Sequence, residues 1–297
     1  MSKFDKPIFI IGAGRSGTTI LKKTLSHHPE FYATAFELNY LWRAGNAGLL
    51  HDQIDPDEHS GKISKSYIRF MLWQMLKRSG KKRLVEKTVA NVMRVPYIYS
   101  VFPEARVIHI IRDGRDVAAS AMKRWRAHSG GGYLFRKALT IPPFDLPRYG
   151  FRYLKNKVKR AVNKTGHDAS WGPRWPDMDE EIKGLPLPAI CARQWVKSIE
   201  AVEDAKWDFP DGQYTEIRYE DLLKNTGAVL DHLQTFLELG KPPAEMWNYA
   251  KNNIRDQGNG WEKNLSENDL ALIMSEAGET LDKLGYLDEN IEEQGVA

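Results

Sequence analysis

The stretch KPIFIIGAGRSGTT, residues 6–19, joins an apolar run to a glycine-rich turn and then to a helical pattern. A nearly continuous apolar run is typical of a strand that is covered on both faces. Gly12, Gly14 and Gly17 allow a tight turn, so the amides of residues 15–19 can point into one concavity at the start of the helix. Amide donors and the helix dipole favour an anion there. The stretch predicts an anion-binding loop, and an ordinary glycine-rich turn is the alternative.

One part of a nucleotide-hydrolysing loop is missing from this stretch. Such a loop reads G-x-x-x-x-G-K-[ST], whereas Thr18 stands here in the lysine position. The lysine and a metal-bound hydroxyl act on the β- and γ-phosphates of a triphosphate. Thr18 therefore disfavours ATP or GTP hydrolysis and leaves the identity of the anion open.

The whole chain has the composition of an ordinary globular protein. Of its 297 residues, 42% are hydrophobic and 28% are charged, and the formal net charge of +4 does not demand a nucleic-acid partner. The first apolar run is too short for a signal sequence or a membrane span. Cys191 is the only cysteine, and no Cys/His group has zinc spacing. These features predict a cytoplasmic protein that binds no metal.

Strand-like and helix-like patterns alternate along the chain. This alternation predicts an α/β fold of the P-loop-like, three-layer type, in which helices cover both faces of a central parallel sheet and ligands bind at the carboxyl ends of the strands. Asn225, Thr226 and Gly227 interrupt one helical pattern, which we expect to resume at Ala228. Ser266 is expected to cap the last helix. The predicted strands cover residues 6–12, 83–88, 105–113 and 213–221, and the predicted helices cover residues 18–25, 64–78, 115–125, 190–205, 221–237 and 266–284.

A basic and aromatic-rich segment interrupts this pattern at about residues 128–187. Between residues 122 and 166 the chain has twelve Lys and Arg residues against one acid, Asp145. Long irregular segments inside compact folds are usually functional or mobile. We predict a single domain over residues 1–297, with this segment as an insertion or lid.

Arg112 and Ser120 are candidates for a second anion site. Arg112 ends the third predicted strand, and Ser120 lies two turns into the following helix. A guanidinium and a hydroxyl in this arrangement can hold a phosphate. The alternative is that Arg112 pairs with Asp113 or Asp116 at the start of the helix.

Four blocks of the sequence together resemble the sulfotransferases that use 3′-phosphoadenosine 5′-phosphosulfate (PAPS), above all the bacterial enzymes and the tyrosylprotein and heparan-type branches. GNGWEKNLS, residues 258–266, is similar to their C-terminal cofactor loop. The blocks are GAGRSGTT (residues 12–19), EKT (86–88), FPEARVIHIIRDGRDVAAS (102–120) and IRYEDLL (217–223).

The resemblance implies a complete set of cofactor contacts. PAPS has a phosphosulfate at its 5′ end and a separate 3′-phosphate, so it needs two anion sites, which accounts for the missing lysine. Arg112 and Ser120 would hold the 3′-phosphate, and Tyr219 would contact the adenine unless it is a buried core aromatic. The 5′ phosphosulfate would contact Gly14, Arg15, Ser16, Gly17, Thr18 and Thr19, and the C-terminal loop would contribute Arg255, Gly258, Trp261 and Lys263.

The resemblance also implies the catalytic groups. Glu37 would be the base that takes the proton of the acceptor hydroxyl, and its alternative role is that of a carboxylate at a helix N-terminus. Lys87 and Arg15 would stabilise the charge on the transferred group without a metal. Asn91 would meet the cofactor or acceptor, or cap a helix. His109, inside a core strand, is predicted to be a structural residue.

The predicted function is transfer of the sulfuryl group from PAPS to a hydroxyl of a glycan, lipid or small-molecule acceptor. The alternatives are a P-loop-type small-molecule kinase that uses ATP, and a non-catalytic nucleotide-binding protein. The aromatic and basic residues of the insertion fit an amphipathic or acidic acceptor, and they also fit an oligomer contact or contact with the margin of a membrane.

Overall fold

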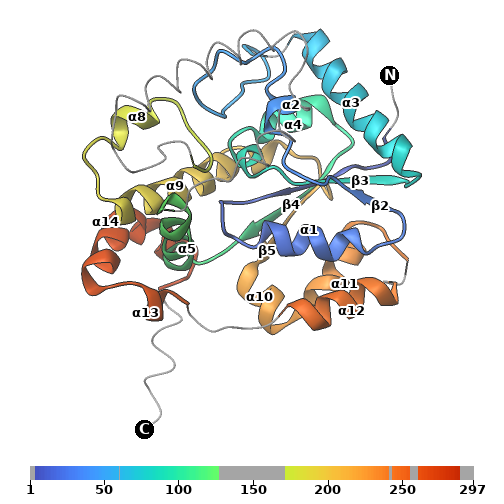
Figure 1. Ribbon diagram of the computed structural model, residues 1–297. Helices are drawn as coiled ribbons and strands as arrows, with labels where there is room; N and C mark the ends of the chain where they lie inside the picture. The colour runs from blue at the N-terminus through green and yellow to red at the C-terminus, as the bar shows by residue number, and fades with distance from the viewer. Residues whose placement is uncertain (1–3, 60, 127–170, 241–242, 255–259, 288–297) are drawn as a thin grey trace.

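The computed structural model describes residues 4–59, 61–126, 171–240, 243–254 and 260–287. Five parallel strands form one sheet with the order β2-β3-β1-β4-β5 (Figure 1). The central strand β1 pairs with β3 on one side and with β4 on the other. The strands are β1 (Ile8–Ile11), β2 (Phe31–Ala33), β3 (Arg83–Glu86), β4 (Arg106–Ile111) and β5 (Tyr214–Arg218).

Alternate residues of the central strand enter two separate hydrophobic cores. Ile8 and Ile10 pack into one core, and Phe9 and Ile11 pack into the other. All four side chains are at most 1% exposed. A strand that is buried on both faces needs apolar residues at every position, which explains the unbroken run IFII.

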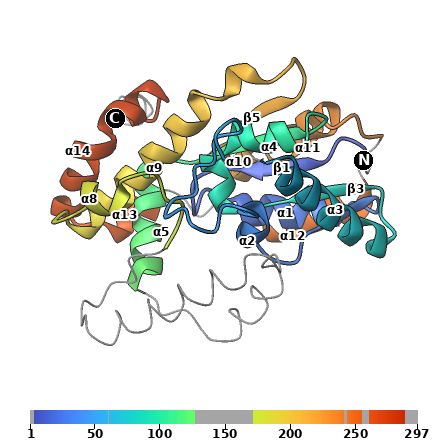
Figure 2. The same cartoon turned by 90° about the horizontal axis from the view of Figure 1, so that it is seen from above.

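Helices cover both faces of the sheet, as the sequence predicted. Figure 1 shows α1, α10, α11 and α12 on one side of the sheet and α3 and α4 on the other. Figure 2 shows α9 and α14 side by side at one end of the molecule, where α9 also contacts α5. The helices are α1 (Thr18–Ser26), α2 (Asn39–Trp42), α3 (Lys62–Ser79), α4 (Val95–Val101), α5 (Gly114–Arg126), α8 (Met178–Glu181), α9 (Leu187–Glu203), α10 (Tyr219–Lys224), α11 (Thr226–Phe236), α12 (Ala244–Asn253), α13 (Gly260–Asn264) and α14 (Glu267–Lys283), and the 3-10 helices are η1 (Val89–Met93) and η3 (Lys206–Asp208).

Several local features differ from the sequence prediction, among them the helices α2, α4, α8, α12 and α13, which were not predicted, and one feature agrees with it. The strand β2 was not predicted, because three residues are too few to show a periodic pattern. The helix expected to resume at Ala228 begins at Thr226 instead, after a separate helix α10. The cap of α14 is confirmed as a full capping box, in which Ser266 Oγ accepts from the Asp269 amide.

Only the last part of the predicted insertion lies within the described residues. Residues 127–170 lie outside them, and this range includes the aromatic residues Tyr133, Phe135, Phe144, Tyr149, Phe151 and Tyr153. In the part that is described, Trp175 and Met178 are buried in the larger core. Trp175 is therefore occupied by packing and is not free to meet an acceptor. Among the helices described, none combines the length and the apolar character needed to cross a bilayer.

Candidate active site

The candidate residues follow the carboxyl ends of all five strands. Across the sheet they come in the order Glu37 after β2, Lys87 after β3, the glycine-rich loop after β1, Arg112 after β4 and Tyr219 after β5. Because parallel strands lie about 4.8 Å apart, this row extends over roughly 19 Å. Within this row the glycine-rich loop and Arg112 follow neighbouring strands, whereas Glu37 and Lys87 lie on the other side of the loop.

The glycine-rich loop connects β1 to α1 through left-handed backbone. Gly17 has φ of 90°, and Arg15 has φ of 80°, a conformation that costs energy for a residue with a side chain. A Cβ atom on Gly17 would lie 2.3 Å from Cδ2 of Tyr219, so only glycine lets this ring pack on the loop. Gly17 is the N-cap of α1 and supplies no side-chain cap, which leaves the first amides of the helix available.

Unpaired donors beside the loop fit a bound anion. Ser16 is 1% exposed, and its hydroxyl has no hydrogen-bond partner among the described residues. Arg112 Nε is also buried and has no hydrogen-bond partner among the described residues. Buried polar groups normally have partners, so these two donors are available to a polar ligand at the loop. Gly14 adds a close approach, because Trp171 lies 3.2 Å from the position of a Cβ atom there.

Arg112 and Ser120, the candidates for a second anion site, lie beside the glycine-rich loop. Arg15 Nε donates to Ser120 Oγ at 2.9 Å, and Arg112 Nη1 donates to the Arg15 carbonyl at 3.2 Å. The Arg112 guanidinium lies 4.5 Å from the ring centroid of Tyr219. Arg112 Nη2 also forms an ion pair with Asp116 Oδ2 at 3.0 Å, which is the alternative role expected for Arg112. Arg112 therefore makes this ion pair and contacts Arg15 and Tyr219 as well. The structure thus brings Arg15, Arg112, Ser120 and Tyr219 together.

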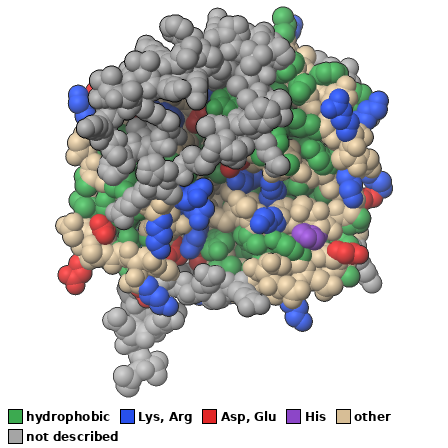
Figure 3. Space-filling model, in the orientation of Figure 1, with side chains coloured by type: hydrophobic (Ala, Val, Ile, Leu, Met, Phe, Trp, Pro, Cys, Tyr) green, Lys and Arg blue, Asp and Glu red, His purple; other side chains and the backbone are tan. Residues whose placement is uncertain are grey.

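Arg124 adds positive charge to this cluster, although the sequence alone did not point to it as a site residue. The pKa of Arg15 is lowered, first by partial burial and then by the charges of Arg124 and Arg112. Arg124 lies on α5 one turn after Ser120. Figure 3 shows Lys and Arg side chains gathered between α5 and the beginning of α1. Cations that repel one another in this way favour an anionic ligand between them.

Glu37 and Lys87 form an ion pair at the other end of the row. Lys87 Nζ lies 2.7 Å from Glu37 Oε1, and the side chains are 8% and 30% exposed. Glu37 precedes the N-cap residue Leu38 of the four-residue helix α2. The pair places a carboxylate and an ammonium beside the strand ends β2 and β3, on the side of the loop opposite Arg112.

A second lysine approaches this pair. Lys22 Nζ donates to the Thr34 carbonyl at 2.8 Å, which links α1 to the segment that leads to Glu37. Burial, followed by the charge of Lys87, lowers the pKa of Lys22, while the charges of Glu86 and Glu37 oppose this. Lys22 was not predicted. Its position one turn after Thr18 on α1 is the only signal in the sequence that points to it.

Several remaining candidates have other surroundings. Asn91 is buried inside η1 and donates to Glu86 Oε2 at 2.8 Å, so it does not cap a helix. His109 is fully buried, with Nδ1 3.0 Å from the Tyr214 hydroxyl, as expected of a structural residue. Trp261 lies in α13, where its ring packs under the Arg115 guanidinium at 4.4 Å.

The C-terminal loop is described only in part. Arg255 and Gly258 lie outside the described residues, while Lys263 is exposed on α13. The helix α13 contacts α5, the helix that carries Ser120. The described part of this loop therefore lies on the same side of the sheet as the Arg112 cluster.

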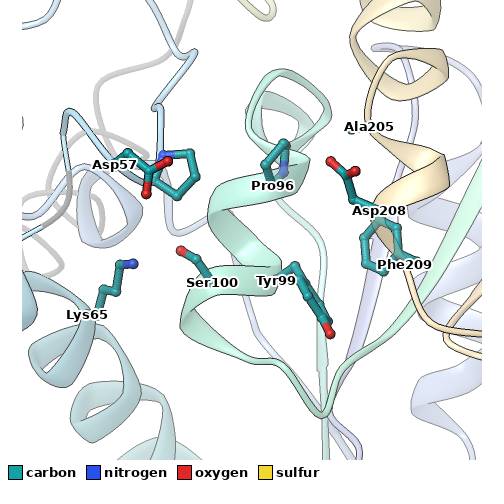
Figure 4. A pocket seen from close by; sticks show the side chains of 9 residues that line it. Asp57, Lys65, Pro96, Tyr99, Ser100, Ala205, Asp208 and Phe209 are labelled. Atoms are coloured by element: carbon teal, nitrogen blue, oxygen red, sulfur yellow. The ribbon is translucent and has the colours of Figure 1, made fainter.

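A pocket elsewhere on the molecule contains none of the candidate residues. Its volume is about 380 Å³, and Pro56, Asp57, Lys65, Pro96, Tyr99, Ser100, Ala205, Asp208 and Phe209 line it. Figure 4 shows Tyr99 and Ser100 on α4 between Lys65 on one side and Asp208 and Phe209 on the other. Tyr99 and Ser100 lie shortly before β4, and Asp208 and Phe209 shortly before β5, so the pocket lies toward the amino ends of these strands, away from the candidate residues.

The fold and the loop define a P-loop-like α/β protein in which threonine replaces the loop lysine. A family model described as "Sulfotransferase family" matches residues 7–156, about half of the chain. The protein belongs to the sulfotransferase family.

Individual relatives match parts of the chain. Nodulation protein NoeE of Sinorhizobium fredii is 31% identical over 130 residues, which cover 39% of this chain and 31% of NoeE. Human protein-tyrosine sulfotransferase 1 is 25% identical over 169 residues, 53% of this chain and 41% of the human protein. The chain thus spans less than half the length of these relatives.

Solved structures resemble the fold over nearly the whole chain. Sulfotransferase STF9 from Mycobacterium avium has a TM-score of 0.54 at 12% identity and covers 95% of this chain and 77% of its own. The sulfotransferase domain of the Synechococcus PCC 7002 olefin synthase has a TM-score of 0.51 at 16% identity, with 93% and 95% covered. At these identities the likeness shows the fold alone.

Proposed function

We propose that the protein transfers the sulfuryl group of PAPS to a hydroxyl group of an acceptor. The observation that carries the proposal is the contact between Arg15 and Ser120, which joins the glycine-rich loop to the second anion-binding group. A ligand that has two anionic groups fits two such neighbouring sites. Membership in the sulfotransferase family supports PAPS as that ligand.

The ends of the cofactor would contact different parts of the row. The loop amides, Ser16 and the N-terminus of α1 would hold the 5′ phosphosulfate. Arg112 and Ser120 would hold the 3′-phosphate, and Tyr219 would pack against the adenine. Trp261 and Lys263 of α13, together with Arg255 and Gly258, are assigned to the 3′-phosphate end of the cofactor. At the 5′ end, the assigned loop residues also include Gly14, Arg15, Gly17, Thr18 and Thr19.

The chemistry follows from the Glu37–Lys87 pair. PAPS supplies a sulfuryl group on a good leaving group. Glu37 accepts the proton of the acceptor hydroxyl while the new O–S bond forms. The S–O bond to the 5′-phosphate breaks, and its electron pair remains on the phosphate oxygen of adenosine 3′,5′-bisphosphate. Lys87 and Arg15 stabilise the negative charge that develops on the sulfuryl and phosphate oxygens. No step in this scheme requires a metal ion.

The acceptor is proposed by class only. A glycan, a lipid or a small-molecule alcohol fits the scheme, because each offers a hydroxyl that needs a base. We assign acceptor binding to the insertion at about residues 128–187 within one domain of residues 1–297. Trp171, which lies at Gly14, is the described aromatic of this insertion nearest the loop.

The cofactor assignment is tested by thermal unfolding with adenosine 3′,5′-bisphosphate, ADP and ATP. A ligand at a hundred times its dissociation constant adds about 2.7 kcal/mol to the free energy of unfolding. The bisphosphate should raise the melting temperature more than ADP or ATP does. A shift with ATP but none with the bisphosphate would favour the kinase alternative and contradict the proposal.

The catalytic assignment is tested with Glu37→Gln, which removes the base and keeps the shape of the side chain. The variant should retain the melting shift with adenosine 3′,5′-bisphosphate and lose about 100-fold or more of the turnover. The readout is ³⁵S transferred from labelled PAPS to a metabolite extract of the source organism. Glu30→Gln, the same change at an exposed residue before β2, is the matched control. Normal turnover of Glu37→Gln would exclude this mechanism. The mechanism would also be excluded if the unmodified protein bound adenosine 3′,5′-bisphosphate but transferred no ³⁵S.

A further inference from the structure

The last residue of β3 is a carboxylate with no access to solvent. Glu86 is 0% exposed. Thr88 Oγ1 donates to Glu86 Oε1 at 2.5 Å, and Asn91 Nδ2 donates to Glu86 Oε2 at 2.8 Å. Each carboxylate oxygen therefore has a neutral donor that points at it. Glu86 is not among the residues assigned to PAPS or to proton transfer.

Thr88 connects this carboxylate to the segment that carries Glu37. Its hydroxyl accepts a hydrogen bond from the Leu38 amide at 2.8 Å, in addition to the one it donates to Glu86. A hydroxyl has one proton. Because the hydroxyl proton is donated to Glu86 Oε1, Thr88 Oγ1 uses a lone pair to accept the hydrogen bond from the Leu38 N–H. Glu86 thus sets the direction of the Thr88 hydroxyl.

The segment around Glu37 depends on such contacts because it has no regular structure of its own. Between β2 and α2, residues 34–38 are held by Thr34, whose amide donates to the Val85 carbonyl at 3.0 Å, and by the Leu38 amide. Glu37 is adjacent to the second anchor. Leu38 is 1% exposed, so its amide has no water as an alternative partner.

We propose that Glu86 and Thr88 are positioning residues that hold Glu37 in place for proton transfer. This inference rests on the proposed function. The three residues EKT then act on one target: Lys87 pairs with the Glu37 carboxylate, Thr88 holds the backbone next to it, and Glu86 orients Thr88. A buried carboxylate costs free energy, and an apolar residue of similar size would avoid that cost. We attribute the presence of this buried carboxylate to its role in orienting the Thr88 hydroxyl.

The test uses Thr88→Val, which keeps the shape of the side chain and removes the hydroxyl. A displacement of the base by about 1 Å costs about 100-fold in rate, so the turnover measured as ³⁵S transfer to the metabolite extract should fall by about 10- to 100-fold. Thr88→Ser keeps the hydroxyl and should restore most of the turnover. Both variants should retain the melting shift with adenosine 3′,5′-bisphosphate, since Thr88 is not assigned to the cofactor.

A double-mutant cycle separates positioning of Glu37 from general damage. In the Glu37→Gln background, where no base remains to be positioned, Thr88→Val should change the residual turnover by less than about twofold. An equal loss in both backgrounds would overturn the proposal. If Thr88→Val lowers the yield of folded protein, Thr88→Ala replaces it, because the smaller side chain leaves room for water at the Leu38 amide.

Hydrogen exchange gives a readout that does not depend on activity. The Leu38 amide should exchange faster in Thr88→Val than in the unmodified protein, and at the original rate in Thr88→Ser. Faster exchange with unchanged turnover would show that the contact exists without positioning the base, and would refute the inference. Absence of any ³⁵S transfer by the unmodified protein would refute the proposed function itself, whatever the exchange rates.

Discussion

Replacement of Glu86 by glutamine should change how the stability of the protein depends on pH. Burial is the main cause that raises the pKa of Glu86 from 4.5 to about 7, and the hydrogen bond from Thr88 opposes it. The charge of Glu37 raises the pKa further, and the charge of Lys87 lowers it. Since the side chain is fully buried, solvent does not screen this effect.

The sign follows from proton binding. Between pH 4.5 and about 7 the folded protein keeps a proton on Glu86 that the unfolded chain has lost, so the free energy of unfolding falls as the pH rises through this window. A shift from 4.5 to about 7, at about 1.4 kcal/mol per unit, corresponds to about 3 kcal/mol. A glutamine amide does not titrate, so the Glu86→Gln variant should gain up to this amount relative to the unmodified protein as the pH rises.

The variant can be accommodated because Asn91 has a free acceptor. Asn91 Oδ1 is buried and has no partner among the described residues, and rotation of its amide would let it accept from the Nε2 of the introduced glutamine. The Oε1 of the same glutamine can still accept from Thr88. Urea unfolding of both proteins at about pH 5 and about pH 8 measures the effect. A stability difference that stays the same at both pH values would refute the assigned pKa and its cause.

Two further substitutions test the loop and the last helix. Gly17→Ala should abolish most of the melting shift with adenosine 3′,5′-bisphosphate, because the new Cβ would meet Tyr219; Gly80→Ala, with φ of 69° and no atom within 4 Å, is the control that adds the backbone strain alone. If both variants keep the full shift, the close approach of Tyr219 to the loop is unimportant for binding. Ser266→Ala should lower the free energy of unfolding in urea by about 1 kcal/mol, because the Asp269 amide loses its cap, and no change would mean that the capping box contributes nothing.

The loop and its strand could be predicted from the sequence because their signals are local. IFII is apolar at each position, and the glycines stand where the backbone turns or approaches a neighbour. The cap of α14 is equally local, since Ser266 and its partner are three residues apart. The roles proposed for these residues in binding PAPS came from resemblance to a family and stay predictions.

The residues that were missed depend on contacts between distant segments. Lys22 reaches Thr34 from another element, and Thr88 reaches Leu38 across fifty positions of the chain. The strand β2 is recognisable only from its pairing with β3. No periodic pattern within a few residues reports such contacts. The ion pair of Glu37 with Lys87 is a contact of the same kind, although resemblance had already suggested both residues.

By itself, the sequence determined the α/β architecture, the glycine-rich loop and the absence of the loop lysine, because strand burial, turn chemistry and residue type are properties of neighbouring positions. Only the tertiary structure decided that Arg15 contacts Ser120, that Lys87 pairs with Glu37 and that Glu86 faces Thr88. The physical reason is the parallel sheet, which brings the carboxyl ends of strands far apart in sequence to one edge. The order of those strands, and with it the order of the charges along the row, is set by packing of the whole chain.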